Sequence, residues 1–475
     1  MNARFVILLA FGLTSLTLAA QQSFENKLDE LLEKQDYKNA SVGIQITNLE
    51  TGENIYSLNP NRLFIPASTM KLVSSASALE ILGADYRFKT VLGYLGKVKK
   101  NGTLEGDLLV KGGADPALGS EYFRDYYFEF LKNWAKQIKA AGIEKVNGNL
   151  VMDGSIFDSE KVPATWIWED IGNYYGAGPN AFTVYDNMFR ITFQSPAKVN
   201  ELTNIIATYP IIEGMNITNE VRSSERNVDN AYVFGSPFDK VRVIRGTIPA
   251  GRKAFTIKAA MHNPEEILAA DFRTALAAEG IFVRGNVLFE KRDNKNFQPV
   301  FTQESPTLAE IAKVLNYESV NLFAEHFLKQ IAVEENLGGN RDKAIEFVKE
   351  YWQSKDLPID DIFIEDGSGL SHFNAISPAF FVSLLKYMEN NEAFVNSLPV
   401  AGKGTLTRFD SKLFPGTTLQ AKSGSMTRVR CYSGYLTTNK GDKLAFSLMF
   451  NHFSGSHSAL IEEIQKLLET IKSEM

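Results

Sequence analysis

Two hairpin-like patterns at opposite ends of the chain constrain its fold more than any other feature. Residues 40–47 and 53–58 are strand-like runs on either side of a turn-forming stretch at 48–52, which predicts a β-hairpin. Residues 430–438 and 443–451 repeat the pattern around an Asn-Lys-Gly-Asp turn. Because each hairpin has to bury its apolar face, we expect both to join one antiparallel sheet with helices packed on it.

Apolar residues at helical spacing predict the helices that cover this sheet. One helix is expected near the N-terminus, and another closes the chain. Their apolar positions are Phe24, Leu28, Leu31 and Leu32 in the first helix and Leu460, Ile464, Leu467, Leu468 and Ile471 in the last. The predicted fold class is therefore α+β, with an antiparallel sheet flanked by helices.

The middle of the chain has a different predicted secondary-structure pattern. Short strand-like runs alternate with loops between residues 87 and 299. Three segments that begin at Gly106, Gly148 and Gly285 each lead from a glycine turn into a strand, although their similarity is too weak for a solenoid repeat. We interpret this region as a large β-rich insertion that forms one or two extra domains. The predicted domains are 21–86 with 300–475, and the inserted 87–299.

The first twenty residues have the composition of a secretory signal peptide. Arg4 supplies a positive charge, residues 5–18 are mostly apolar, and Ala19-Ala20 precedes a polar stretch, which is typical of a cleaved signal. The alternative is an uncleaved anchor, but this apolar run is shorter than the ~20 residues that span a bilayer. We therefore expect an exported, periplasmic protein that is not integral to the membrane.

Charge and cysteine content exclude several classes of partner and cofactor. The chain has 50 basic and 56 acidic residues without a basic stripe, so we expect no nucleic acid partner. Its single cysteine, Cys431, excludes an internal disulfide, and export without disulfides favours a bacterial envelope. Cys431 lies in a strand-like run and is interpreted as a buried hydrophobe. The five histidines lack metal-binding spacing, so neither a metal nor another cofactor is predicted.

A serine and a lysine three residues apart form the first motif with catalytic potential. Pro66 precedes a predicted helix, whose first turn carries Ser68 and Lys71 on one face. This spacing lets an amine reach a hydroxyl, as activation of a serine without histidine requires. The pair alone is a weak signal, because Ser195/Lys198 and Ser383/Lys386 have the same spacing.

Two further motifs follow in a specific order. Ser319 and Asn321 open a helical run, and Lys422-Ser423-Gly424 lies on a strand-like run before the last hairpin. Ser-x-x-Lys, Ser-x-Asn and Lys-[Ser/Thr]-Gly occur in this order in penicillin-binding proteins and serine β-lactamases. The joint occurrence is far more specific than any one motif.

With these motifs the chain resembles the D-alanyl-D-alanine carboxypeptidase/endopeptidases of the class C low-molecular-mass penicillin-binding type. The resemblance covers nearly the whole mature chain and includes the large insertion between the first two motifs. It also includes residues 110–116, 175–177, 184–187, 366–371 and 434–435. The chain departs from the family at Ser423, where threonine is usual, and at His372, where many members have arginine.

The resemblance implies a serine peptidase mechanism and a set of partners. Ser68 would form an acyl-enzyme, with Lys71 as the base. The resemblance further implies proton relay by Ser319, orientation by Asn321, a carboxylate anchor at Lys422 with Ser423 and Gly424, and an oxyanion site at the N–H groups of Ser68 and Ser425. Its expected partners are peptidoglycan stem peptides ending in D-Ala-D-Ala and, as covalent inhibitors, β-lactams.

The insertion carries one candidate for substrate selection. Asp170 ends the stretch Trp166-Ile167-Trp168-Glu169-Asp170, which resembles a family segment whose acidic residue receives the free amine of a diamino-acid side chain. A carboxylate beside indoles is partly shielded from water, so its contact with an ammonium would be strengthened. The alternative is that Asp170 caps a helix or faces solvent.

Two other functions remain open on the same motifs. A serine β-lactamase or esterase on this core would differ mainly in the rate of deacylation. A non-catalytic envelope protein would use the fold only to bind wall peptides. The inserted middle argues against the first alternative, and the intact motif residues argue against the second.

Overall fold

The computed structural model describes residues 22–293, 295–359 and 362–474. The predicted signal peptide, residues 1–20, lies outside the described residues. Among the residues described, no helix has both the length and the apolar character needed to cross a bilayer. The chain forms two compact units: unit 1 contains the described residues up to 80, 312–319 and those from 345 onward, and unit 2 contains 81–311 and 320–344.

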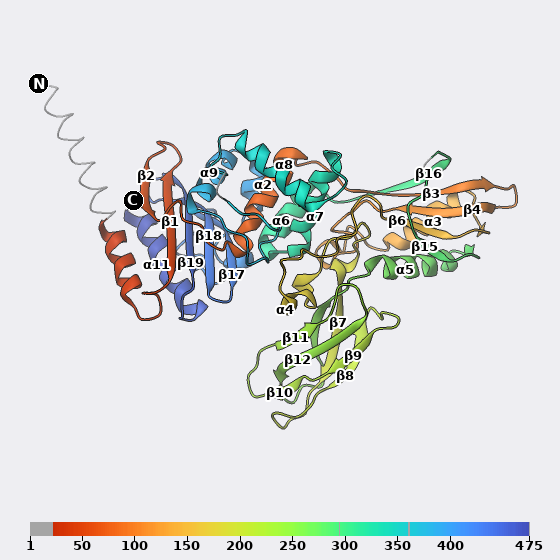
Figure 1. Ribbon diagram of the computed structural model, residues 1–475, viewed down its shortest axis with the longest axis horizontal. Helices are drawn as coiled ribbons and strands as arrows, with labels where there is room; N and C mark the ends of the chain where they lie inside the picture. Colours follow the sequence, from red (N-terminus) through yellow and green to blue (C-terminus); the bar gives the residue numbers. More distant parts are fainter. Residues whose placement is uncertain (1–21, 294, 360–361, 475) are drawn as a thin grey trace, which may run out of the picture. The chain divides into compact units, whose positions relative to one another are not determined.

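Unit 1 is built on an antiparallel sheet that joins the two ends of the chain. Within the described residues the strand order is β17-β18-β19-β1-β2 (Figure 1). The bounds are Ser41–Asn48 for β1, Asn54–Leu58 for β2, Leu419–Met426 for β17, Val429–Thr437 for β18 and Lys443–Asn451 for β19. Strand β1 pairs with β19, which places Ile44 opposite Leu448. The single sheet expected from the two hairpin patterns is confirmed.

The two faces of this sheet have different roles. Ile44 and Ile46 point into an apolar core formed with the helical residues 22–33 and with helix α11, His457–Glu474. Side chains alternate along a strand, so Gly43 points the other way, against Phe64 and the first residue of helix α9, Pro378–Met388. The apolar face thus stabilises unit 1, and the opposite face receives the motif-bearing elements.

Further helices of unit 1 position these elements. They are η1 at Ala67–Met70, α10 at Glu392–Ser397 and η5 at Gly404–Leu406, together with the greater part of α2 at Lys71–Ile81, of α6 at Leu308–Glu318 and of α8 at Arg341–Gln353. The buried Asn316 of α6 donates to the hydroxyl of Ser75 in α2 at 3.2 Å and to that of Ser397 in α10 at 2.8 Å. One carboxamide therefore ties three helices together.

Unit 2 contains three sheets in the described residues. The largest has β3 Lys89–Val98, β4 Thr103–Lys111, β5 Lys145–Val146, β6 Leu150–Asp153, β14 Phe282–Val283, β15 Val287–Phe289 and β16 Phe297–Glu304. The second has β7 Met188–Gln194, β8 Asn204–Tyr209 and β13 Phe255–Ala260. The third has β9 Asn216–Asn219, β10 Arg222–Ser224, β11 Asn230–Phe234 and β12 Val241–Pro249. This composition agrees with the predicted β-rich insertion.

The three weakly similar segments of the insertion lie side by side. Strands β4, β6 and β15 pair in parallel. Asp107 Oδ1 accepts the N–H of Asn149 at 2.8 Å, and Asn149 Oδ1 accepts the N–H of Asn286 at 3.0 Å. A Cβ at Gly148 or Gly285 would lie 2.4 Å from the corresponding side-chain oxygen. The repeated glycine-Asx pair therefore has a structural cause. The Asx side chain accepts an N–H of the neighbouring strand, and the glycine of that strand leaves space for the Asx oxygen.

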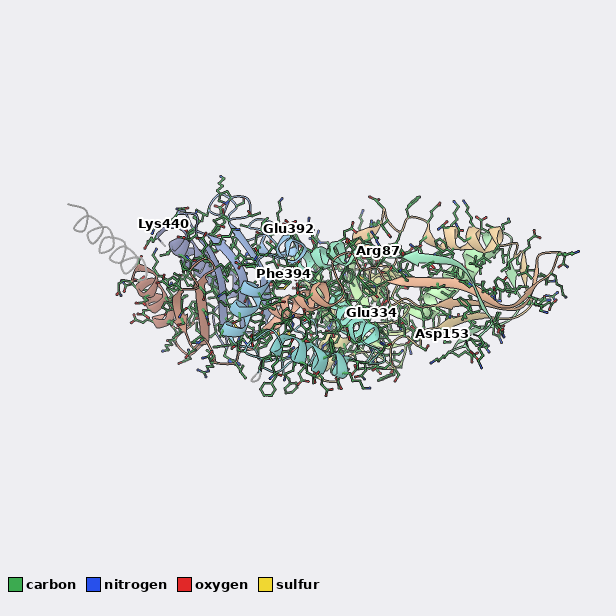
Figure 2. All side chains as sticks on the ribbon, turned by 90° about the horizontal axis from the view of Figure 1, so that it is seen from above. Arg87, Asp153, Glu334, Glu392, Phe394 and Lys440 are labelled. Carbon is green, nitrogen blue, oxygen red and sulfur yellow. The ribbon has the colours of Figure 1, made fainter. Side chains whose placement is uncertain are left out.

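Helices complete unit 2. They are α3 at Phe130–Ala140, α4 at Trp168–Ile171, α5 at Pro264–Ala278 and α7 at Asn321–Glu334, with the short helices η2 at Glu121–Phe123, η3 at Tyr174–Gly176 and η4 at Tyr185–Asn187. Trp134 of α3 packs edge-on against Phe272 of α5, with ring centroids 5.5 Å apart. Glu334, labelled in Figure 2, ends α7 and accepts the hydroxyl of Tyr86 at 2.7 Å.

Helix α7 groups with the insertion, although it lies in the stretch 300–475 of the sequence. Its buried side chains include polar ones that contact residues of the insertion. His326 Nε2 and the hydroxyl of Thr183 lie 2.7 Å apart, and Lys329 donates to Asp158 at 2.5 Å. The domain limits 21–86 with 300–475 and 87–299 stay a prediction.

Candidate active site

The first motif lies where η1 passes into α2. Lys71 Nζ is 3.0 Å from Ser68 Oγ, so the amine reaches the hydroxyl as the spacing predicted. Ser68 is partly exposed, whereas the other three residues of η1 are buried. The side chain of Lys71 is fully buried. The arrangement presents one hydroxyl to solvent and keeps the amine behind it.

The chain before Ser68 is tied to the sheet. Asn451 Oδ1 accepts the N–H of Ile65 at 2.8 Å, and Asn451 Nδ2 donates to the carbonyl of Ile65 at 3.2 Å. Ala67 then adopts a left-handed conformation with φ of +45°, which is costly for a residue with a Cβ. The reciprocal pair at Ile65 helps to hold this strained turn in place.

Two glycines leave room for the same turn. A Cβ at Gly424 of β17 would lie 2.3 Å from the carbonyl oxygen of Pro66 and 3.2 Å from the nitrogen of Ser68. A Cβ at Gly369 would lie 1.9 Å from the carbonyl oxygen of Ala67. Strand β17 and the loop around Gly369 therefore both press against the backbone that carries Ser68.

The loop at 366–371 supplies a contact that the sequence did not reveal. Lys71 Nζ donates to the carbonyl of Ser368 at 2.6 Å. The sequence indicated residues 366–371 only as part of the family resemblance, and a backbone acceptor is not encoded by a side-chain type. The sequence feature that could have indicated this contact is the Asp-Gly-Ser-Gly stretch. Asp366 shapes the loop, because its carboxylate accepts the N–H groups of Gly369 at 2.8 Å and Ser371 at 2.7 Å.

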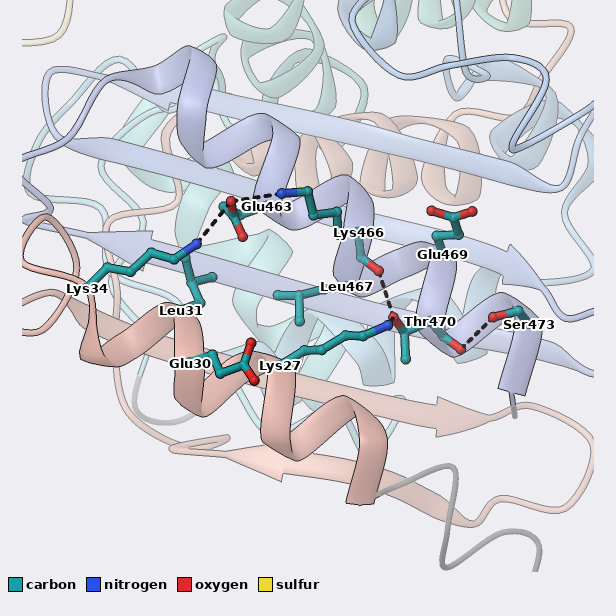
Figure 3. Close-up of a pocket in the computed structure, with 10 residues that line it drawn as sticks. All are labelled: Lys27, Glu30, Leu31, Lys34, Glu463, Lys466, Leu467, Glu469, Thr470 and Ser473. Carbon is teal, nitrogen blue, oxygen red and sulfur yellow. Dashed lines mark hydrogen bonds and ion pairs between the residues drawn. The ribbon is translucent and has the colours of Figure 1, made fainter.

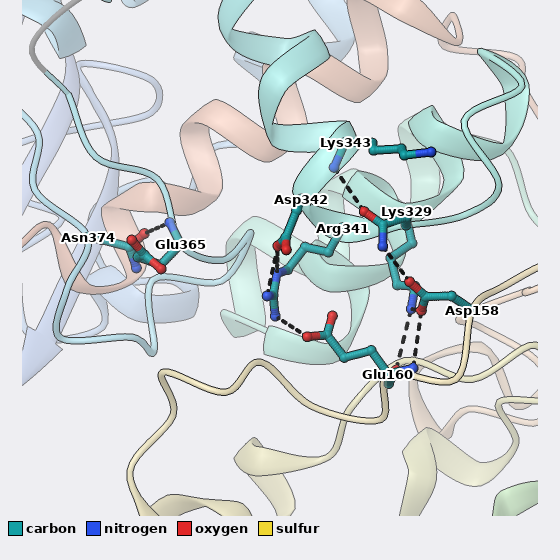
Figure 4. Close-up of polar contacts among 9 residues, drawn as sticks. Asp158, Glu160, Lys329, Arg341, Asp342, Lys343, Glu365 and Asn374 are labelled. Atoms are coloured by element: carbon teal, nitrogen blue, oxygen red, sulfur yellow. Dashed lines mark hydrogen bonds and ion pairs between the residues drawn. The ribbon is translucent and has the colours of Figure 1, made fainter.

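The same loop is held from its far side by Asn374. Its Nδ2 donates to Asp366 Oδ1 at 2.8 Å, and its Oδ1 accepts the N–H of Glu365, also at 2.8 Å (Figure 4). Asp366 and Asn374 are both fully buried. The carbonyl that faces Lys71 is thus positioned by a buried carboxylate and a buried carboxamide.

The third motif places a second buried amine in the site. Lys422 Nζ donates to Ser319 Oγ at 3.0 Å and to the carbonyl of Ser423 at 2.8 Å. Burial lowers the pKa of Lys422 well below its ordinary value, and the positive charges of Lys71 and Arg430 lower it further. A carboxylate bound beside Lys422 would favour its charged form.

Ser319 and the remainder of the third motif complete this part of the site. Ser319 follows α6 in a left-handed conformation with φ of +59°, which directs its hydroxyl to Lys422. Ser423 is buried, Gly424 faces the turn of Ser68, and Ser425 is exposed. Unit 1 therefore brings together Ser68, Lys71, Ser319 and Lys422–Ser425.

The other two candidates, Asn321 and Asp170, belong to unit 2. Asn321 begins α7 and donates from Nδ2 to the carbonyl of Tyr175 at 2.8 Å. Asp170, in the first turn of α4, is partly buried and hydrogen-bonded to the hydroxyl of Tyr175. Burial, then the charge and hydrogen bond of Asp170, raise the pKa of Tyr175. The sequence had placed Tyr175 only within a motif and not between these two residues.

One of the competing serine-lysine pairs, Ser195/Lys198, occupies a structural position. Ser195 donates to the carbonyl of Pro249 at 2.6 Å and accepts the N–H of Arg252 at 2.9 Å. Its partner Lys198 forms an exposed ion pair with Glu201. Burial raises the pKa of Cys431 to about 12, so its thiol stays protonated. These groups are explained by packing.

The histidines likewise have structural surroundings. Burial lowers the pKa of His262 and of His326 to about 3, so both rings are neutral. In the described ranges, no group of three or more histidine, cysteine, aspartate or glutamate side chains could hold a metal. His372 is partly buried next to Ser371, and its suggested correspondence to the family's arginine stays a prediction.

A groove of about 480 Å³ lies between the helical residues 22–33 and α11 (Figure 3). Its lining includes three lysines and three glutamates, so their charges balance. Glu463 pairs with both Lys34 and Lys466 at 3.1 Å. The groove lies with the helices that cover the apolar face of the sheet, away from the motifs, and receives no catalytic role.

Comparisons with known proteins identify a family and several relatives. The model of the D-Ala-D-Ala carboxypeptidase 3 (S13) family matches residues 24–472. A D-alanyl-D-alanine carboxypeptidase of Actinomadura sp. (strain R39) is 28% identical over 92% of this chain and 82% of its own. The D-alanyl-D-alanine carboxypeptidase DacB of Haemophilus influenzae is 26% identical, over 87% and 86%.

Solved structures confirm the fold. The crystal structure of penicillin binding protein 4 from Haemophilus influenzae has a TM-score of 0.81 at 24% identity and covers 95% of this chain and 99% of its own. A second structure of that protein, complexed with a β-lactam, has a TM-score of 0.76 at 22% identity, with coverage of 92% and 97%. The predicted α+β class with a large insertion is correct.

Proposed function

The chain belongs to the D-Ala-D-Ala carboxypeptidase 3 (S13) family, whose model spans residues 24–472, and on this premise we propose that Ser68 is its catalytic nucleophile. The protein is a serine-type D-Ala-D-Ala carboxypeptidase, as the family resemblance implied. The observation that carries the proposal for Ser68 is the 3.0 Å contact between Lys71 Nζ and its partly exposed hydroxyl.

In the proposed reaction, Ser68 Oγ attacks the carbonyl carbon of the penultimate D-alanine. Lys71 accepts the hydroxyl proton, the C–N bond breaks, and the terminal D-alanine leaves after its nitrogen receives a proton. The contact between Lys422 and Ser319 supports a relay role for the Ser319 hydroxyl in that last transfer. Water then cleaves the ester and restores Ser68.

Strand β17 is suited to hold the substrate backbone and its terminal carboxylate. It is the outermost strand of the sheet in unit 1, and an extended peptide can align along such an edge. We assign Lys422 and Ser423 to the carboxylate, with Gly424 leaving room for the peptide. The N–H groups of Ser68 and Ser425 would stabilise the oxyanion, and the closeness of Gly424 to the Ser68 nitrogen supports this pairing.

The two candidates in unit 2 are proposed to have the roles that the resemblance implies. We assign Asn321 to the orientation of the substrate amide and Asp170 to a free amine on the substrate side chain. Asp170 is partly buried beside the phenol of Tyr175, so an ammonium there would interact more strongly than at an open surface. The helix-cap alternative is weakened because Ile167, not Asp170, occupies the N-cap of α4.

We further propose where the protein acts and on which substrates. The proposed substrates are peptidoglycan stem peptides that end in D-Ala-D-Ala, and β-lactams are proposed to acylate Ser68. The signal-like residues 1–20 support export to the periplasm.

Labelling with penicillin tests the nucleophile. Mass spectrometry of a digested adduct is expected to find the label on Ser68 alone, and Ser68→Ala is expected to abolish both labelling and peptidase activity. Ser383→Ala is the matched control, because Ser383 also precedes a lysine by three residues and should keep both. A label on Ser195, Ser383 or Cys431, or full peptidase activity in Ser68→Ala, would overturn the assignment. Rapid loss of the label with free penicilloate would instead indicate a β-lactamase.

A further inference from the structure

We propose that Tyr175 is a positioning residue that couples recognition of the substrate's side-chain amine at Asp170 to the placement of Asn321. The inference rests on the proposed roles of Asp170 and Asn321. Its basis is that one residue contacts both: the hydroxyl of Tyr175 is hydrogen-bonded to Asp170, and its carbonyl accepts Asn321 Nδ2 at 2.8 Å. All three residues lie within unit 2.

The backbone between Asp170 and Tyr175 is a tight turn. A Cβ at Gly176 would lie 2.1 Å from the carbonyl oxygen of Asp170, so η3 packs directly on the end of α4. Asn173 Nδ2 donates to the carbonyl of Glu169 at 2.6 Å, and Asn173 Oδ1 accepts the N–H of Val233 at 3.0 Å. Because the turn is tied on both sides, Asp170 and Tyr175 move together.

The phenol end of Tyr175 is a donor under ordinary conditions. Burial and the negative charge of Asp170 raise the pKa of Tyr175, so its hydroxyl keeps its proton and donates to the carboxylate. An ammonium that binds Asp170 would restrict the movement of this carboxylate and so of the phenol that is hydrogen-bonded to it. Recognition of the amine would therefore fix the orientation of Tyr175.

The carbonyl end of Tyr175 meets the first residue of α7. Val320 occupies the N-cap of this helix and makes no side-chain cap hydrogen bond. The carboxamide of Asn321 is instead oriented by its hydrogen bond to the backbone carbonyl of Tyr175. A shift in the backbone of Tyr175 would move the acceptor of Asn321 Nδ2. Asn321 is two residues from Ser319, which contacts Lys422.

The rest of α7 is fixed along its buried face (Figure 4). Lys329, which is 2% exposed, donates to Asp158 Oδ1 at 2.5 Å, and Arg341 beyond the helix pairs with Glu160 at 3.1 Å. Because these contacts prevent the helix from sliding, a movement of Tyr175 would be taken up by the side chain of Asn321.

This coupling predicts which kinetic parameter, kcat or KM, changes when the substrate carries the amine. Energy that is used to position a catalytic group raises kcat, whereas a contact of equal strength in the bound and transition states changes only KM. We therefore expect the amine-bearing peptide to exceed an amine-free peptide in kcat. In Tyr175→Phe, which keeps the carbonyl and loses the hydroxyl, this advantage should vanish.

The test is a comparison of kcat and KM for a matched pair of peptides ending in D-Ala-D-Ala, with and without the side-chain amine. Tyr175→Phe should lower kcat for the amine-bearing peptide by about 10-fold, as expected for a lost hydrogen bond to a charged group, and leave the amine-free peptide close to wild type. Tyr174→Phe, at the exposed neighbouring phenol, is the control and should behave as wild type. Thermal unfolding verifies that each variant folds.

The outcomes separate the inference from the function on which it rests. Equal effects of Asp170→Asn on both peptides would overturn the proposed role of Asp170. A selective effect of Asp170→Asn with no selectivity in Tyr175→Phe, or with a change confined to KM, would overturn the coupling alone. If the coupling holds, the double variant should lose no more kcat than the single variants, because both changes remove the same interaction.

Discussion

Buried lysines in the two units have opposite surroundings. Lys422 in unit 1 is fully buried and donates to a hydroxyl and a carbonyl, whereas Lys329 in unit 2 is equally buried but donates to the carboxylate of Asp158. None of the ion pairs between described residues involves Lys422. The amine in unit 2 has its counter-charge within the protein, while the amine in unit 1 lacks one until a ligand supplies it.

This difference separates a stabilising use of buried charge from a functional one. A buried amine without a counter-charge is costly to protonate, and burial with two nearby cations lowers the pKa of Lys422 accordingly. A paired lysine is retained because removal of either partner leaves a buried charge. We infer that Lys422 is kept in an unfavourable environment so that it can receive the terminal carboxylate of the substrate.

The largest effect that tests this comparison is expected from Lys422→Ala. It should reduce kcat/KM by about 30–1000-fold, or about 2–4 kcal/mol, for substrates with a free terminal carboxylate, because the ionic anchor is lost. A substrate amidated at its C-terminus is the control and should lose much less. Equal losses on both substrates would show that Lys422 is not the anchor.

Lys329→Met should affect stability and not substrate anchoring. The substitution leaves Asp158 without its ion-pair partner, and because Asp158 keeps 27% of its side chain exposed, we expect a loss of about 1–3 kcal/mol in the free energy of unfolding, less than for a fully buried pair. Chemical denaturation measures it. Lys132→Met, in an exposed pair with Glu129, is the control and should change stability by less than about 0.5 kcal/mol.

A result for Lys329→Met that matches Lys422→Ala would contradict the comparison. A large loss of kcat/KM for carboxylate substrates with unchanged stability would mean that both buried lysines serve the substrate. Unchanged stability with unchanged activity would mean that the pair with Asp158 contributes nothing measurable.

Side-chain patterns predicted most of the sheet and helices of unit 1. They did not predict the contacts made by backbone carbonyls. The strand-like runs within 40–58 and 430–451 encode the sheet directly, because strand-forming and turn-forming residues are local signals. Spacing also predicted that Lys71 reaches Ser68. The carbonyls of Ser368 and Tyr175 were not predictable, since every residue has a carbonyl and only the fold decides which one an amine or amide meets.

The grouping of α7 shows a second limit. Its residues follow position 300, where the predicted terminal domain resumes, so the sequence assigned it to that domain. In the structure, His326 and Lys329 bind residues of the insertion. Buried polar pairs of this kind join segments far apart in sequence. The residue type of one partner does not predict which residue it will contact.

The smallest effect concerns the cost of keeping Lys422 buried. The ordinary pKa of a lysine is 10.5, and that of Lys422 in the folded protein lies well below it. Above pH 10.5 the amine is neutral in both the folded and the unfolded protein, so its titration does not change the free energy of unfolding. As the pH falls, the unfolded chain binds a proton that the folded protein does not, so the folded state loses stability until the pH reaches the lowered pKa.

Replacement by an uncharged side chain of similar length removes this linkage. Lys422→Met should therefore unfold at a higher temperature than wild type at pH 7, by about 2–4 °C, and the difference should shrink as the pH approaches 10.5. The variant also loses the hydrogen bonds to Ser319 and Ser423, a loss that does not depend on pH and sets a constant offset. Scanning calorimetry of both proteins between pH 7 and 10 separates the two contributions, because only the linked one varies. A pH-independent difference, or one that grows with pH, would mean that Lys422 is charged in the free enzyme and has a counter-charge after all, which would remove the contrast with Lys329.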